Sequence, residues 1–168
     1  ADFIIAHPNH GFISLEVKGG IIDRKNKEWY STSRFTGKKH KIKDPIKQAR
    51  DAKHAVLSIL KNNWPKGDMP FVRCNHGAIF PHSGQPEENA NFLRADIPRD
   101  LVIFASDLTN IYSNILKIFY FGKSGEFGKL GNEGIEILHH QFIKDFKFHV
   151  KVEHELDIYD AKFHGLTE

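Results

Sequence analysis

The sequence predicts a domain of the α/β or α+β class, with a mixed β-sheet flanked by helices. Short runs that alternate apolar and polar side chains fill the first 33 positions, and such runs are typical of strands. Apolar side chains then recur at helical spacing over residues 45–62, and strand-like runs and a second helical pattern follow. Strands and helices that alternate within 168 residues favour one core and a sheet covered by helices.

Two hairpins are expected at the start of the chain. Residues 2–6 and 12–18 form two strand-like runs, and the Pro, Asn and Gly between them are typical of a tight connection. A second hairpin is expected over residues 21–33, with its turn at residues 25–27.

The helix over residues 45–62 is predicted by its start as well as by its periodicity. Asp44 is a favourable N-cap, and Pro45 suits the first helical position. The apolar residues that recur at helical spacing are Ile46, Ala49, Ala52, Val56, Ile59 and Leu60.

The middle of the chain is expected to add further strands. Residues 71–80 have strand character, with a break predicted at residues 75–77, where an Asn-His-Gly sequence interrupts them. A polar loop is expected over residues 81–91, and residues 101–105 form a short apolar run typical of a buried strand.

Two more helices are expected after this strand. Asp107 is predicted to cap a helix whose apolar positions run from residue 108 to 119. Glycines at every third position from 122 to 134 predict a flexible loop, and a last helix is expected over about residues 133–145. An alternating segment, residues 146–158, follows it.

Composition and charge narrow the class of protein. The chain has 24 Lys and Arg against 21 Asp and Glu, a net charge of +3, which permits a polyanionic partner without requiring one. The single cysteine, Cys74, allows no internal disulfide and no zinc site built from cysteines, so we expect a reducing, cytoplasmic location. No apolar stretch approaches the roughly 20 residues of a membrane span, so no membrane partner is expected.

The first hairpin predicts a pair of facing carboxylates. If residues 8–10 form a three-residue loop, the apolar side chains of Phe3 and Leu15 face each other, and so do those of Ile5 and Ile13. The same register places Asp2 opposite Glu16 on the other face, with Lys18 two residues further along.

Opposed carboxylates repel unless a cation lies between them. Their Cβ atoms would be about 4.5–5.5 Å apart, and carboxylates with a backbone carbonyl and water are ligands that Mg²⁺ prefers. Lys18 would then help to deprotonate a water molecule or offset charge on a phosphate. The alternative is an ordinary exposed hairpin face, on which Asp2, Glu16 and Lys18 are merely solvated.

These residues also resemble a known family. The motif resembles the signature of the PD-(D/E)xK nuclease superfamily, and its wider context resembles the nuclease-related domain family, NERD. The residues that carry the resemblance are Asp2, the segment His7-Pro8-Asn9-His10-Gly11, Glu16, Val17, Lys18, Gly19 and Gly20, and then Gly37 to His40 and Lys43 to Ala49.

The resemblance implies a restriction-endonuclease-like α/β core and Mg²⁺-dependent cleavage of phosphodiester bonds in DNA, with Mn²⁺ as a substitute. By position, Asp2, Glu16 and the Val17 carbonyl become metal ligands and Lys18 the catalytic lysine. Gln48 resembles the helix glutamine that contacts the active-site water or lysine in related nucleases.

The family pattern also has an acidic residue on a helix before the hairpin, and this sequence begins at the first strand. We therefore expect residues 1–168 to be one NERD-like domain whose first helix lies upstream. Residues 165–168 resemble the approach to a superfamily 1 helicase, so a fused or associated helicase domain is also expected as a partner. A homo-oligomer is compatible with the sequence.

A basic stretch follows the second hairpin and contains no acid. Near a nuclease site it would contact phosphates, and the alternative is a solvated loop. Its proposed nucleic-acid-binding residues are Arg34, Lys38, Lys39, Lys41 and Lys43. Trp29 and Tyr30 are expected to pack rather than to stack on bases, and Cys74 is expected to be a buried small side chain.

The functional hypothesis is a metal-dependent deoxyribonuclease that serves DNA processing, repair or antiviral defence. The alternative is a non-catalytic nucleic-acid-binding module of a larger, helicase-type protein. A small-molecule phosphatase is disfavoured, because the sequence has no evident phosphate-cradling loop.

Overall fold

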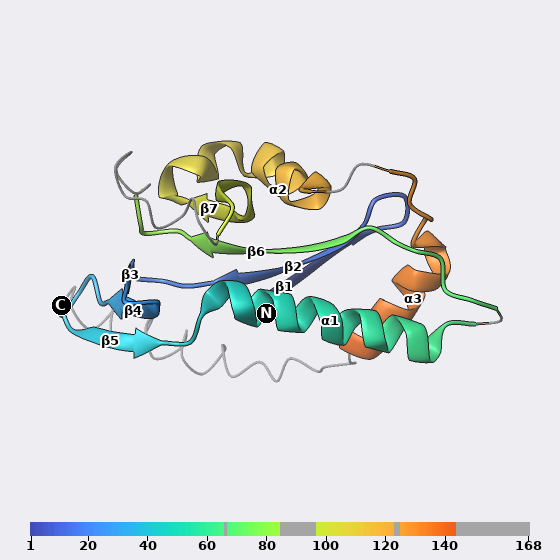
Figure 1. Ribbon diagram of the computed structural model, residues 1–168, viewed down its shortest axis with the longest axis horizontal. Helices are drawn as coiled ribbons and strands as arrows, with labels where there is room; N and C mark the ends of the chain where they lie inside the picture. Colours follow the sequence, from blue (N-terminus) through green and yellow to red (C-terminus); the bar gives the residue numbers. More distant parts are fainter. Residues whose placement is uncertain (66, 85–96, 123–124, 144–168) are drawn as a thin grey trace, which may run out of the picture.

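A four-stranded mixed sheet forms the centre of the protein in the computed structural model, which describes residues 1–65, 67–84, 97–122 and 125–143. The strand order is β1-β2-β6-β7 (Figure 1). β1 and β2 form the antiparallel hairpin, whereas β6 pairs parallel with β2 and β7 parallel with β6. The bounds of these strands are Phe3–His7, Gly11–Val17, Cys74–Phe80 and Val102–Phe104.

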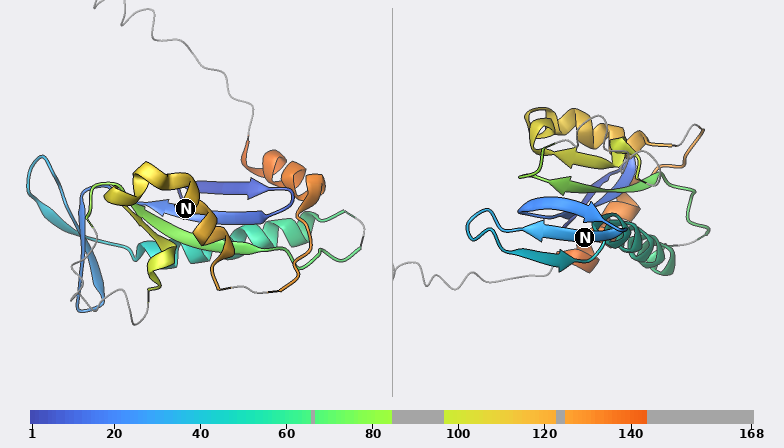
Figure 2. Two further views of the ribbon diagram at one scale, coloured as in Figure 1. Left: turned by 90° about the horizontal axis from the view of Figure 1, so that it is seen from above. Right: turned by 60° about the vertical axis from the view of Figure 1, so that its left-hand side comes forward.

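A second, three-stranded antiparallel sheet stands at the carboxyl end of β2, where Figure 2 shows it beside the main sheet. It contains β3 (Ile21–Lys25), β4 (Glu28–Thr32) and β5 (Lys39–Ile42). Asn26 and Lys27 both have positive φ, 52° and 63°, as the two-residue turn of a tight hairpin requires. The second predicted hairpin is therefore confirmed, and the basic stretch supplies a third strand.

Helices cover both faces of the four-stranded sheet, as Figure 1 shows. α1 (Pro45–Asn63) packs on β2 and β6 from one side, and α2 (Ile111–Tyr120) from the other. The α1 face buries Phe12, Val56 and Leu60, and the α2 face buries Ile13, Leu15 and Ile118. α3 (Gly131–Phe142) contacts α1 and β1. This arrangement is the predicted α/β fold and is consistent with restriction-endonuclease-like domains.

The start of α1 confirms the prediction from its capping residues. The side chain of Asp44 accepts a hydrogen bond from the backbone N–H of Lys47 at 2.9 Å, and Pro45 occupies the first turn. The short buried strand predicted at residues 101–105 is also confirmed, as β7.

Three sequence predictions for the part of the chain after α1 were wrong. β6 runs unbroken through residues 75–77, because Gly77 serves close packing rather than a turn. Asp107 does not cap α2: its carboxylate accepts the N–H of Phe104 at 2.8 Å within a 3₁₀ segment, Ala105–Asn110, that precedes the helix. The glycine-rich loop ends before residue 134, because α3 already begins at residue 131.

The alternating segment 146–158, the last residues of the final predicted helix and most of the loop 81–91 lie outside the described residues. Among the residues that are described, no helix combines the length and the apolar character needed to cross a membrane.

Candidate active site

Glu16 and Lys18 meet at the carboxyl end of β2. Glu16 is 3% exposed and lies on the face of β2 that α1 covers, the same face as Phe12. The Nζ of Lys18 donates to its Oε1 at 2.5 Å, and the side chain of Lys18 is 24% exposed. A buried carboxylate therefore shares this strand end with a cation that reaches the solvent.

Asp2 lies beside this pair, although the regular strand pairing stops before it. The register predicted from the apolar pattern is confirmed from Phe3↔Leu15 to His7↔Gly11. Asp2 instead donates its N–H to the Leu15 carbonyl at 2.9 Å, and its Oδ2 accepts the N–H of Val17 at 2.7 Å. The Asp2 carboxylate is thus held at the residue between Glu16 and Lys18, and not as a ladder partner of Glu16.

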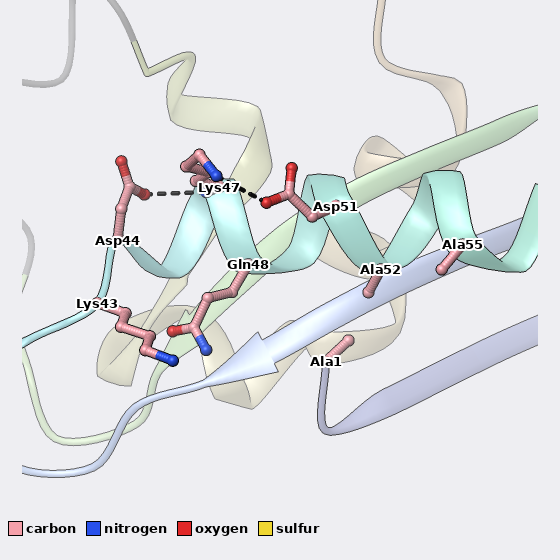
Figure 3. A pocket seen from close by; sticks show the side chains of 8 residues that line it. All are labelled: Ala1, Lys43, Asp44, Lys47, Gln48, Asp51, Ala52 and Ala55. Atoms are coloured by element: carbon pink, nitrogen blue, oxygen red, sulfur yellow. Dashed lines mark hydrogen bonds and ion pairs between the residues drawn. The ribbon is translucent and has the colours of Figure 1, made fainter.

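An open pocket of about 700 Å³ lies along the first turns of α1, with Ala1 on its other side, as Figure 3 shows. Asp2, Glu16 and Lys18 are not among the residues that line it. Gln48 and Lys43 extend into the same region in that view. Ala1 also lines the pocket, and its amino group lies 3.3 Å from Oε2 of Glu16. The Oε1 of Gln48 is buried and has no hydrogen-bond partner among the described residues.

The groups near Glu16 that could bind a metal ion offer oxygen atoms as ligands. The carboxylate of Glu16 accepts a hydrogen bond from Lys18, and Asp2 and the Gln48 amide add further oxygens nearby. Such ligands suit a hard divalent cation, which keeps several waters of its own. The part of the chain that the structure describes contains no cluster of three or more His, Cys, Asp or Glu side chains arranged to hold a metal ion. A cation here would therefore depend on two carboxylates, the Val17 carbonyl and water.

The basic stretch contains lysines that form ion pairs within the three-stranded sheet and cations that do not. Lys39 pairs with Asp23 at 2.7 Å, and Lys41 pairs with Glu28. The hydrogen bonds that Glu28 accepts from Lys41 and Tyr30 lower the pKa of this carboxyl. These two lysines are thus engaged in ion pairs within the sheet.

The other three basic residues of the stretch are exposed and have no ion pair among the described residues. Lys43 lines the pocket beside Gln48, and Arg34 lines a second cleft beside the double glycine. Lys38 lies next to β5 at the end of the preceding turn.

The expected packing of the aromatic and cysteine side chains is confirmed. Trp29 is 2% exposed and its ring lies 5.9 Å from that of Phe80, whereas Tyr30 donates to Glu28 at 2.8 Å. Cys74 is buried.

Sequence reasoning did not single out His82 or Phe35. His82 accepts the N–H of Gly20 at 3.1 Å, although 62 positions separate the two residues, so no local pattern could place them together. Phe35 is 98% exposed. Its position inside a basic turn was a signal available in the sequence.

Comparison with protein families gives one result. Residues 1–80 match the model of the nuclease-related domain, NERD, and this range contains Asp2, Glu16, Lys18 and Gln48. Searches of curated proteins and of solved structures found no match. The first 80 residues are therefore similar to the nuclease-related domain family.

Proposed function

We propose that this protein is a metal-dependent nuclease that hydrolyses phosphodiester bonds in DNA. The observation that carries the proposal is the contact between buried Glu16 and Lys18 at the end of β2, within the range that matches the nuclease-related domain. The pocket beside this contact is open, and although Lys47 on its wall pairs with Asp51, Lys43 has no ion pair among the described residues and is available to a phosphodiester.

Glu16, Asp2 and the Val17 carbonyl would hold the cation. Mg²⁺, or Mn²⁺ in its place, supplies Lewis-acid polarisation of a phosphodiester when bound. Lys18 donates a hydrogen bond to the phosphate oxygen on which charge develops. Gln48 uses its unpartnered Oε1 to accept a hydrogen bond from the attacking water and so orients it.

The test is cleavage of single- and double-stranded DNA by the full chain, with Mg²⁺ or Mn²⁺. Glu16→Gln and Lys18→Ala should abolish cleavage. Two exposed residues offer matched controls, Glu136→Gln on α3 and Lys61→Ala at the end of α1, and both should cleave normally. Unchanged cleavage in Glu16→Gln and Lys18→Ala would overturn the proposal.

A non-catalytic DNA-binding module is the second candidate. It is favoured by the small number of acidic ligands, because the described residues bring no third carboxylate to Asp2 and Glu16. Salt-sensitive binding of DNA without cleavage under any divalent metal would support this function instead.

The surrounding biology is also a proposal. A cytoplasmic nuclease of this kind would serve DNA processing, repair or defence against foreign DNA, alone or with a helicase domain. Reconstitution with candidate helicases and cleavage assays on branched and linear DNA would test these roles.

A further inference from the structure

A second cleft, of about 320 Å³, adjoins Lys18. Gly19 and Gly20, which follow Lys18 directly, form one wall. Arg34 and Phe35, from the turn between β4 and β5, line it together with His82, which follows β6. The cleft is therefore built from three segments that meet only in the folded chain, and its glycine wall directly follows Lys18 in the sequence.

The double-glycine wall is fixed in place. Gly20 has a φ of +80°, and a Cβ on it would lie 2.5 Å from Oγ of Ser31, so no other residue fits there without a shift. Its N–H donates to Nδ1 of His82 at 3.1 Å. Since Nδ1 accepts this bond, the neutral ring carries its proton on Nε2, which makes Nε2 a hydrogen-bond donor.

The turn that carries Arg34 and Phe35 is also well ordered by hydrogen bonds. Oγ of Ser33 accepts the N–H groups of Phe35 and Thr36 at 3.3 and 3.2 Å, and the Ser33 carbonyl accepts the N–H of Gly37 at 2.9 Å. These bonds hold the backbone of the turn, on which the side chain of Phe35 is 98% exposed. Burying such a side chain against a partner would be favourable.

The groups that line the cleft are complementary to a polynucleotide strand. A guanidinium and an imidazole donor suit a phosphate, and an exposed phenyl ring beside them suits the face of a base. Lys39 and Lys41 already have acidic partners, so the charge available here comes from Arg34. A free phosphate ion would use the guanidinium alone, whereas alternating phosphate and base use both groups.

We infer that this cleft binds the DNA strand next to the scissile phosphate, with Arg34 and His82 on a flanking phosphate and Phe35 stacked on a base. The inference rests on the proposed function in one respect, which is that the scissile phosphate of the same strand lies at Lys18. Binding itself is measurable without metal and without cleavage.

The experiment measures fluorescence anisotropy of a labelled single-stranded thymidine 12-mer with the full chain in EDTA. Arg34→Gln should lower the slope of log K against log salt by about 0.7, the value for one phosphate contact on a single strand. Phe35→Ala should weaken binding by about 5-fold or more. His82→Asn, whose amide oxygen can still accept the Gly20 N–H, should weaken it through loss of the Nε2 donor.

An abasic 12-mer separates the two kinds of contact. The Arg34→Gln effect should persist on it, because the phosphates remain, whereas the Phe35→Ala effect should vanish. Lys61→Ala on α1 and Tyr112→Ala on α2 are the matched controls, since both side chains are exposed and lie on other elements. Circular dichroism verifies that each variant is folded.

These outcomes are independent of catalysis. If Arg34→Gln and Phe35→Ala bind as the control variants do, the inference is overturned even where Glu16 and Lys18 prove essential for cleavage. If the chain binds as expected but cuts no DNA with any metal, the cleft is supported and the nuclease proposal fails.

Discussion

The Nζ of Lys18 lies 2.5 Å from Oε1 of Glu16, and the two side chains extend from alternate residues of one strand end. Because Glu16 is 3% exposed, its carboxylate has little contact with water and is stabilised by the ion pair with Lys18. Removing one member of such a pair costs more than removing both, since the remaining charge stays buried.

Lys18→Met should therefore destabilise the protein by about 1–3 kcal/mol. The double variant Glu16→Gln/Lys18→Met should lose less stability than the sum of the two single variants, because it leaves no buried charge. Urea denaturation of the four proteins measures this coupling. Additive losses would show that the two side chains act independently in solution.

The hairpin register was predictable because its determinants are local. Alternating apolar residues and a Pro-Asn-His loop fix Phe3 opposite Leu15, and the structure confirms this pairing. The burial of Glu16 was not predictable in the same way. It follows from α1 covering the second face of β2, an arrangement that depends on the parallel pairing of β2 with the distant β6.

The ion pairs of the basic stretch show the same limit of prediction from sequence. Charge counting along the sequence treats Lys39 and Lys41 like Arg34 and Lys43. Strand pairing places the two lysines beside Asp23 and Glu28, acids that precede them by 16 and 13 positions. Only the tertiary register decides which cations remain available to a ligand.

Gln48 should prove important for cleavage but not for stability. Its Oε1 is buried and has no hydrogen-bond partner among the described residues, so Gln48→Leu removes no bond from that part of the protein. We expect the free energy of unfolding to stay within about 0.5 kcal/mol. Cleavage should fall by about 10- to 100-fold, because the attacking water loses its orientation.

Urea denaturation measures the stability of Gln48→Leu, and initial rates measure its cleavage of DNA. Glu136→Gln, an exposed substitution on α3 outside the pocket, is the control and should cleave as the native chain does. Full cleavage activity in Gln48→Leu would remove this residue from the proposed site.

Gly77 should tolerate no side chain. A Cβ there would lie 2.7 Å from the Leu101 carbonyl oxygen and 2.8 Å from Cδ1 of Ile118, so the backbone itself would have to move. Gly77→Ala should cost about 1–3 kcal/mol by urea denaturation. Gly84→Ala is the matched control, because no atom of the described residues lies within 4 Å of its added Cβ. Equal stability of the two variants would contradict the close packing of β6 against α2.

His76 should make the protein less stable in mild acid. Burial lowers the pKa of this imidazole from 6.5 to about 4, and the positive charges of Lys53, Arg50 and His54 on α1 contribute in the same direction. Above pH 6.5 the ring is neutral in both the folded and the unfolded chain, so the full stability is present. Between pH 6.5 and 4 the unfolded chain binds the proton first, and stability is lost as the pH falls.

The loss should amount to about 1–2 kcal/mol, since the ring is only partly buried and solvent screens its charge. Unfolding free energies of the native chain and His76→Gln, measured from pH 7.5 to 4, isolate this contribution from that of the other histidines. The difference between the two proteins should change across this range and level off below about pH 4. A constant difference would mean that His76 binds its proton equally well in the folded and unfolded chains, and that burial beneath α1 does not control its charge.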